Sequence, residues 1–267
     1  MLRPPAVAGQ FYPGARDSLA RVLGQLLPAK APKTSVLGVM SPHAGYIYSG
    51  VVAGKVFAGV EIPPEVVILG PNHHGIGHQV AVYSSGGWNT PLGSVQIAED
   101  LAGDILSNCP AAAADTLAHL HEHSLEVQVP FLQTLLPTVK IVPICLGRVS
   151  LDALLALGDG LARAVAGRPQ LPLIVASTDM THYESAEEAR RKDDMALQHV
   201  LALDPEGLYR TVRDERITMC GGLPTVVMLR AALALGATRA DLVAYANSGD
   251  VTGDQRKVVG YAGVAVR

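Results

Sequence analysis

Four apolar, strand-like runs of this 267-residue chain end in side chains that can bind a metal or move a proton. In an open α/β sheet, the loops beyond the carboxyl ends of the strands converge on one crevice. The sequence therefore predicts a single site assembled from distant parts of the chain. The runs are residues 36–43, ending in His43; 66–74, ending in His73 and His74; 171–182, ending in Asp179 and His182; and 242–250, ending in Ser248 and Asp250.

Charge and composition exclude several classes of partner. The 21 Lys and Arg residues against 24 Asp and Glu give a net charge of −3, and no basic stripe forms, so we expect no nucleic-acid partner. No run reaches the roughly 18 apolar residues of a membrane span, and Pro and Gly interrupt the N-terminus before a signal-peptide core forms. Three cysteines without a CxxC pair are typical of a reducing compartment. We expect a cytoplasmic protein with no membrane association.

The periodicity alternates between strands and helices, which favours a three-layer α/β sandwich with a mainly parallel central sheet. We expect one domain over residues 1–267, because no linker or charge run divides the chain. The segment 79–84 is expected as an antiparallel addition, and Ser49 with Gly50 can start a helix after His43. Predicted strands are 35–40, 66–70, 79–84, 139–146, 171–177, 242–247 and 258–266. Predicted helices are 17–27, 94–106, 124–136, 151–166, 185–201, 205–213 and 224–235.

Each histidine at a strand end has two readings. A lone imidazole such as His43 is as often bonded to backbone in a turn as it is a ligand. Neighbouring side chains at a strand end point in opposite directions, so at most one of His73 and His74 faces the crevice. His123 and Glu126 lie one turn apart at a helix start, which suits a base with its orienting carboxylate but also ordinary first-turn acidity.

Two further groups favour a functional reading. Asp179 and His182 place an acid and an imidazole within reach of each other just past an apolar strand. Cys220 precedes a helix whose first turn holds Pro224, and a helix N-terminus stabilises the thiolate that ligates metals. Cys145 lies inside an apolar run and is expected to be a small core residue.

Seven ordered motifs resemble the Memo family, called AmmeMemoRadiSam system protein B in prokaryotes. The resemblance runs from about residue 3 to the C-terminus and implies a fold similar to the LigB-type class III extradiol dioxygenases, which are non-haem Fe(II) enzymes. It implies His43, His73 and Cys220 as metal positions, with Asp179, His182, His123 and Glu126 in or near the same pocket. It also implies association with a radical SAM protein and an AMMECR-type protein. The motifs begin at Pro5, Pro42, Leu69, Trp88, Glu122, Ser177 and Met219.

The expected ligand set differs from that of the dioxygenases, which hold Fe(II) with two histidines and one carboxylate. A Cys220 thiolate favours softer metals, so ring cleavage does not transfer with the fold. Our leading hypothesis is a redox enzyme in which iron or copper acts on a small molecule and His182, held by Asp179, is the acid or base. A zinc-type hydrolase in which Glu126 or His182 activates water is an alternative, with zinc the less favoured metal. A non-catalytic metal-carrying or peptide-binding module is the third hypothesis.

Overall fold

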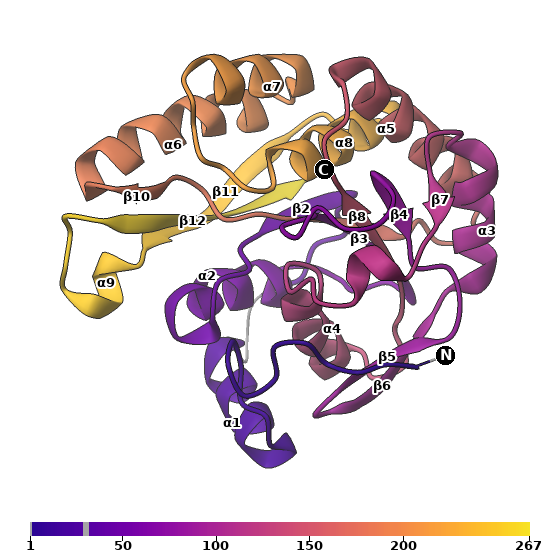
Figure 1. The fold of residues 1–267 in the computed structure, drawn as a ribbon, viewed down its shortest axis with the longest axis horizontal. Coiled ribbons are helices and arrows are strands. Elements are labelled where there is room, and N and C mark those ends of the chain that lie inside the picture. Colours follow the sequence, from indigo (N-terminus) through magenta and orange to yellow (C-terminus); the bar gives the residue numbers. More distant parts are fainter. Residues whose placement is uncertain (1, 29–31) are drawn as a thin grey trace.

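A mixed β-sheet forms the centre of the molecule, with helices on both sides (Figure 1). The computed structural model describes residues 2–28 and 32–267. The strands follow the order β1-β5-β6-β8-β3-β9-β2-β12-β10, with β11 beside β12, and with β4 beside both β8 and β7. Their bounds are β1 Leu2–Arg3, β2 Gly38–Ser41, β3 Glu65–Pro71, β4 Val80–Val82, β5 Gly87–Thr90, β6 Gly93–Ile97, β7 Ala113–Ala114, β8 Lys140–Leu146, β9 Leu173–Ser177, β10 His182–Glu184, β11 Ala240–Asn247 and β12 Val258–Val266.

The four central strands β8, β3, β9 and β2 are parallel neighbours. In β3, Ile68 lies between Pro143 of β8 and Val175 of β9. From Val66 to Pro71 every residue of β3 is buried, because the sheet is covered on both faces. A strand buried on both faces is apolar throughout rather than alternating, and this is the pattern the sequence shows.

Helices α8 and α2 cover opposite faces of the sheet. A side chain at Gly38 would collide with Met228 of α8, whereas one at Gly263 would collide with Val56 of α2, so both helices approach the strands closely. Helices α5 and α7 pack beside α8, and α1 and α4 pack beside α2. The helices are α1 Arg16–Leu26, α2 Tyr46–Ala58, α3 Glu99–Asn108, α4 Val129–Leu135, α5 Leu151–Ala166, α6 Ala186–Leu201, α7 Pro205–Asp214, α8 Gly222–Ala234 and α9 Gly249–Thr252, with short 3₁₀ turns η1 Leu117–His119 and η2 Glu126–Gln128.

The three-layer α/β prediction is confirmed, and β4 pairs antiparallel with β8 as expected for 79–84. The predicted helix 94–106 is wrong at its start, because residues 93–97 form β6 and pair with β5 across a turn in which Gly93 has φ +125°. Helix α2 begins at Tyr46 rather than near Ser49, whose hydroxyl donates to the carbonyl of Ala44. Among the described residues, no helix is long and apolar enough to cross a membrane.

Candidate metal centre

A cavity of about 850 Å³ opens at the carboxyl ends of three adjacent parallel strands, β3, β9 and β2. The residues that follow these strands line it: His43 after β2, His73 after β3 and Asp179 after β9. His123 and His182 complete the polar part of the wall. The structure thus brings together five of the seven side chains singled out from the sequence, and Cys220 contacts two of the five, His43 and Asp179.

His43 is buried in the tight loop between β2 and α2. Its Nδ1 atom lies 2.9 Å from the hydroxyl of Ser177, whose one hydrogen is donated to the carbonyl of Ser124 at 2.6 Å. That hydroxyl can only accept from His43, so Nδ1 carries the proton and Nε2 keeps its lone pair. Burial, followed by the nearby imidazoles of His123 and His73, holds the pKa of His43 well below its usual range. His43 is therefore a neutral nitrogen donor.

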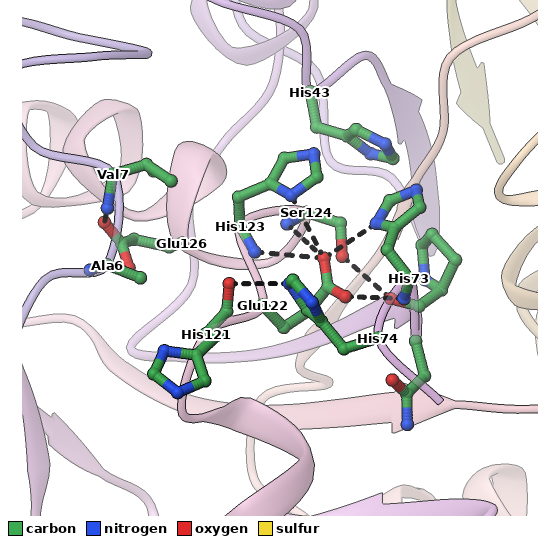
Figure 2. A network of polar contacts seen from close by, with 12 residues as sticks. Ala6, Val7, His43, His73, His74, His121, Glu122, His123, Ser124 and Glu126 are labelled. Carbon is green, nitrogen blue, oxygen red and sulfur yellow. Dashed lines mark hydrogen bonds and ion pairs between the residues drawn. The ribbon is translucent and has the colours of Figure 1, made fainter. Parts of the chain in front are cut away.

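His73 lines the cavity, whereas His74 turns away and places its Nε2 atom 3.0 Å from the carbonyl oxygen of His121 (Figure 2). Nδ1 of His73 lies 2.8 Å from Oε1 of Glu122. An ionised carboxylate can only accept, so Nδ1 donates and Nε2 is left free. A carboxylate behind an imidazole fixes its tautomer and its orientation, as it does for histidines that bind metals.

Glu122 is fully buried and accepts four hydrogen bonds. The donors are the ring and backbone nitrogens of His73 and the backbone nitrogens of His123 and Ser124, at 2.7–3.0 Å. Burial alone would raise the pKa of Glu122, but the His73 and Ser124 donors outweigh it and hold that pKa well below its usual range. Glu122 thus fixes His73 and the peptide of His123 together.

His123 joins His43 and His73 in a cluster of imidazoles. One ring nitrogen from each of the three lies within 4.8 Å of the others, and no further group of this kind occurs among the residues that the structure describes. The His123 ring stacks on that of His73, with centroids 4.7 Å apart, and its centroid lies 4.6 Å from that of the Phe11 ring. Burial lowers the pKa of His123 to about 4, so its ring is neutral at pH 7.

Cys220 lies in the turn before α8 and is half-buried. Its Sγ atom lies 3.2 Å from Nε2 of His43 and accepts the backbone N–H of Asp179 at 3.2 Å. Burial first, and then the Asp179 carboxylate, raise the pKa of the thiol far above its usual value. The predicted stabilisation of a thiolate by the helix start is therefore outweighed, and the thiol can donate to the His43 lone pair.

Asp179 and His182 lie on the cavity wall, each with its own support. One carboxylate oxygen of Asp179 accepts the backbone N–H groups of His43 (2.8 Å) and Ala44 (3.3 Å), and burial raises the pKa of Asp179 to about 6. The Nδ1 atom of His182 lies 2.9 Å from the carbonyl of Thr218, so it donates there and leaves Nε2 free. The predicted orienting role of Asp179 toward His182 therefore falls to Thr218.

Glu126 is the predicted site residue that the structure keeps away from the cavity. Its carboxylate accepts from Arg3 (2.6 Å), Tyr12 (2.6 Å) and the backbone of Ala6 and Val7 (2.7 and 3.1 Å), and its side chain is 1% exposed. Figure 2 shows it turned toward the N-terminal segment. Donors occupy both carboxylate oxygens inside the core, so Glu126 anchors the first residues of the chain and does not face the imidazole cluster.

The supporting residues Glu122, Ser177 and Gln128 were not predicted from the sequence. The Gln128 amide donates to the Ser177 hydroxyl at 2.7 Å and to the carbonyl of Pro42 at 2.9 Å, so it links the two strand ends that carry His43 and Asp179. A polar residue in an otherwise apolar stretch, as Gln128 is between Val127 and Val129, was the available signal.

Comparison with known proteins identifies the family. A family model described as Memo-like protein matches residues 3–265. A MEMO1 family protein of Aquifex aeolicus is 44% identical, with 98% of each chain covered. One of Methanosarcina acetivorans is 42% identical, with 99% of each chain covered, and one of Methanopyrus kandleri is 40% identical over 100% of this chain and 99% of the relative. The chain belongs to the Memo-like protein family.

Proposed function

We propose that this protein binds a redox-active transition metal, iron or copper, and acts on a small molecule as a dioxygenase-like oxidoreductase. The observation that carries the proposal is the fixed tautomer of two imidazoles. Ser177 and Glu122 each take the Nδ1 hydrogen of a histidine, so His43 and His73 both keep an Nε2 lone pair for a ligand. Metal-binding histidines are held in this way through their second nitrogen.

Cys220 is our proposed third ligand, and His123 is the alternative. Sγ of Cys220 lies 3.2 Å from the His43 nitrogen that would bind the ion, and a thiol loses its proton outright when it coordinates a metal. His123 already lies within the 4.8 Å imidazole cluster. A sulfur ligand favours copper or thiolate-bound iron, whereas three imidazoles also suit catalytic zinc. The imidazole cluster is thus the observation that keeps a zinc-type hydrolase as the second candidate.

The metal would supply the Lewis acidity or the electron exchange that activates oxygen or a bound substrate. The chain's own residues would supply the rest. His182, held by Thr218, presents a free Nε2 atom that can take or return a proton at the cavity wall. Asp179 fixes the backbone of His43, and so the position of that imidazole, through two N–H groups.

Elemental analysis of the protein as isolated, followed by anaerobic Fe(II), Cu(I) and Zn(II) titrations, tests the proposal. We expect one metal per chain, with binding lost in His43→Ala and His73→Ala and kept in His74→Ala, the matched control beside the cavity. Stoichiometric binding that survives both of the first two substitutions would exclude this site.

A Co(II) titration identifies the third ligand. If Cys220 coordinates, the parent shows a sulfur-to-metal charge-transfer band that Cys220→Ser removes and that the buried control Cys145→Ser retains. If His123 is the ligand, the band is missing in the parent and His123→Ala loses the metal. Association with a radical SAM protein and an AMMECR-type protein stays a prediction, for which co-purification from the native cell is the measurement.

A further inference from the structure

Tyr183 has a backbone conformation that a bulky residue rarely adopts. Its φ is +62°, in the left-handed region that favours glycine. The other two described non-glycine residues with positive φ, Leu203 and Arg216, each come directly after a helix C-cap, where this conformation is ordinary. Tyr183 lies instead within the short strand β10, immediately after His182. Its conformation is therefore not explained by a helix end.

A β-bulge accounts for the position of Tyr183. His182 pairs with Val259 and Glu184 with Val258, so Tyr183 is the extra residue on its strand. Bulges of this kind redirect a side chain and occur next to active sites. At this bulge Tyr183 lines the cavity and is 73% exposed, with its ring centroid 5.9 Å from that of His182. Backbone strain that is kept beside a site points to a role for the residue that carries it.

Three further aromatic side chains line the cavity. Phe11, Tyr48 and Tyr261 line it together with Tyr183, in a chain that is only 4% aromatic. Tyr48 is 39% exposed, so two phenol rings are accessible from solvent around the imidazoles. Such faces bind planar rings by stacked or edge-to-face contact.

One free positive charge accompanies these rings. Lys257 lines the cavity and makes no ion pair with any residue in the ranges 2–28 and 32–267. Its neighbour Asp254 is already paired with Arg256 (2.8 Å), and Asp179 accepts backbone N–H groups. An anionic group in the cavity would therefore meet Lys257 without displacing an existing partner.

We propose that the cavity binds a small aromatic carboxylate, whose ring contacts Tyr183 and Tyr48 and whose carboxylate pairs with Lys257. This inference rests on the proposed function in assigning the ligand as the substrate of the metal centre. Tyr183 is kept in its strained bulge because the ring must reach this ligand.

Three probes separate the features of the ligand. Benzoate is planar and charged, cyclohexanecarboxylate is charged but not planar, and benzyl alcohol is planar but uncharged. Binding of each to the metal-free and the metal-loaded protein is measured by calorimetry. We expect benzoate to bind more tightly than either analogue in both forms of the protein.

Two substitutions assign the contacts. Tyr183→Gly should weaken benzoate binding by roughly three- to tenfold and abolish the preference over cyclohexanecarboxylate, as expected for the loss of one aromatic contact. Lys257→Met should weaken it by roughly two- to fivefold, as for an exposed ion pair, and abolish the preference over benzyl alcohol. Controls are Arg216→Gly, which relieves the same backbone conformation away from the cavity, and Lys55→Met, which removes an exposed lysine of α2. Both should bind benzoate as the parent does.

Thermal unfolding distinguishes a ligand contact from a structural role. Because glycine accepts the positive φ, Tyr183→Gly should keep or raise the melting temperature while it loses affinity, and Arg216→Gly should keep both. A fall in melting temperature that parallels the loss of binding would overturn the proposal, as would equal affinity for the three probes. If benzoate binds only to the metal-loaded protein and Lys257→Met leaves its affinity unchanged, the carboxylate ligates the metal and the inference fails. Benzoate binding to a chain that takes up no metal would refute the proposed function alone.

Discussion

Replacement of Glu122 by glutamine tests whether one buried carboxylate organises the candidate metal centre. Oε1 of Glu122 accepts from the His73 ring and from the backbone of His123 and Ser124, and Oε2 accepts the backbone N–H of His73. The glutamine oxygen can take the place of Oε1, but its NH₂ group then faces the backbone N–H of His73, so two donors oppose each other. In the reverse orientation the NH₂ group faces the three donors that Oε1 now accepts, which is worse. An unsatisfied buried donor costs about 1–3 kcal/mol, and the remaining bonds lose their charge assistance. We expect the free energy of unfolding to fall by about 3 kcal/mol.

Urea unfolding of the metal-free protein and competition with a chelator measure the two consequences separately. Without the carboxylate behind His73, metal affinity should fall by roughly 10–100-fold. Glu188→Gln is the matched control, because Glu188 lies on the exposed side of α6 and pairs with Arg191. If the Glu122→Gln variant has the same stability and the same metal affinity as this control, the assigned role of Glu122 is refuted.

Three further predictions follow from buried groups. Iodoacetamide should modify Cys220 alone in the native, metal-free protein, and bound metal should stop the reaction. The rate of modification should increase with pH, because burial raises the pKa of that thiol. Equal labelling of the fully buried Cys145 would contradict this prediction. Arg3→Met leaves the Glu126 carboxylate buried without its cation, so the free energy of unfolding measured in urea should fall by about 3–5 kcal/mol. Arg256→Met, which removes an exposed ion pair, is the control, and an equally small loss in both variants would be inconsistent with a buried pair. Burial lowers the pKa of His119 from 6.5 to about 4, so the unfolded chain takes up the proton first and the free energy of unfolding should fall as the pH drops from 6.5 to 4. His119→Gln should lessen this fall by up to about 1.4 kcal/mol per pH unit in acid unfolding curves. An unchanged slope would show that His119 does not contribute.

The strands and most of the cavity residues could be predicted because their signals are local. A strand buried on both faces must be apolar, so β3 and β9 stand out in the sequence, and the polar residue after each one must lie at the sheet edge. His73 and Asp179 were found in this way. The hairpin β5–β6 was missed because its short strands run directly into α3 and share its apolar spacing.

The choice between Glu122 and Glu126 could not be made from spacing. A helix starting at residue 124 would place His123 and Glu126 on one face, but the chain forms a 3₁₀ turn at Glu126–Gln128 and α4 begins only at Val129. Glu126 consequently points toward Arg3, 123 positions away in the sequence. Contacts between such distant segments depend on the whole fold, and no periodicity within a window of the sequence reveals them.

The order of the cavity residues along the chain has a consequence for biosynthesis. His43 and Cys220, whose side chains lie 3.2 Å apart, are separated by 177 positions in the sequence. Strand β9 lies between β2 and β3 in the sheet, but it comes after both of these strands in the sequence. During translation the first two histidines emerge long before the strand that must lie between them, so the centre cannot assemble on a nascent N-terminal half. Pairings between such distant segments form slowly, because loop closure must precede the contacts that reward it. Metal uptake during synthesis should therefore mark the end of folding, and chains released early should carry no metal at these positions.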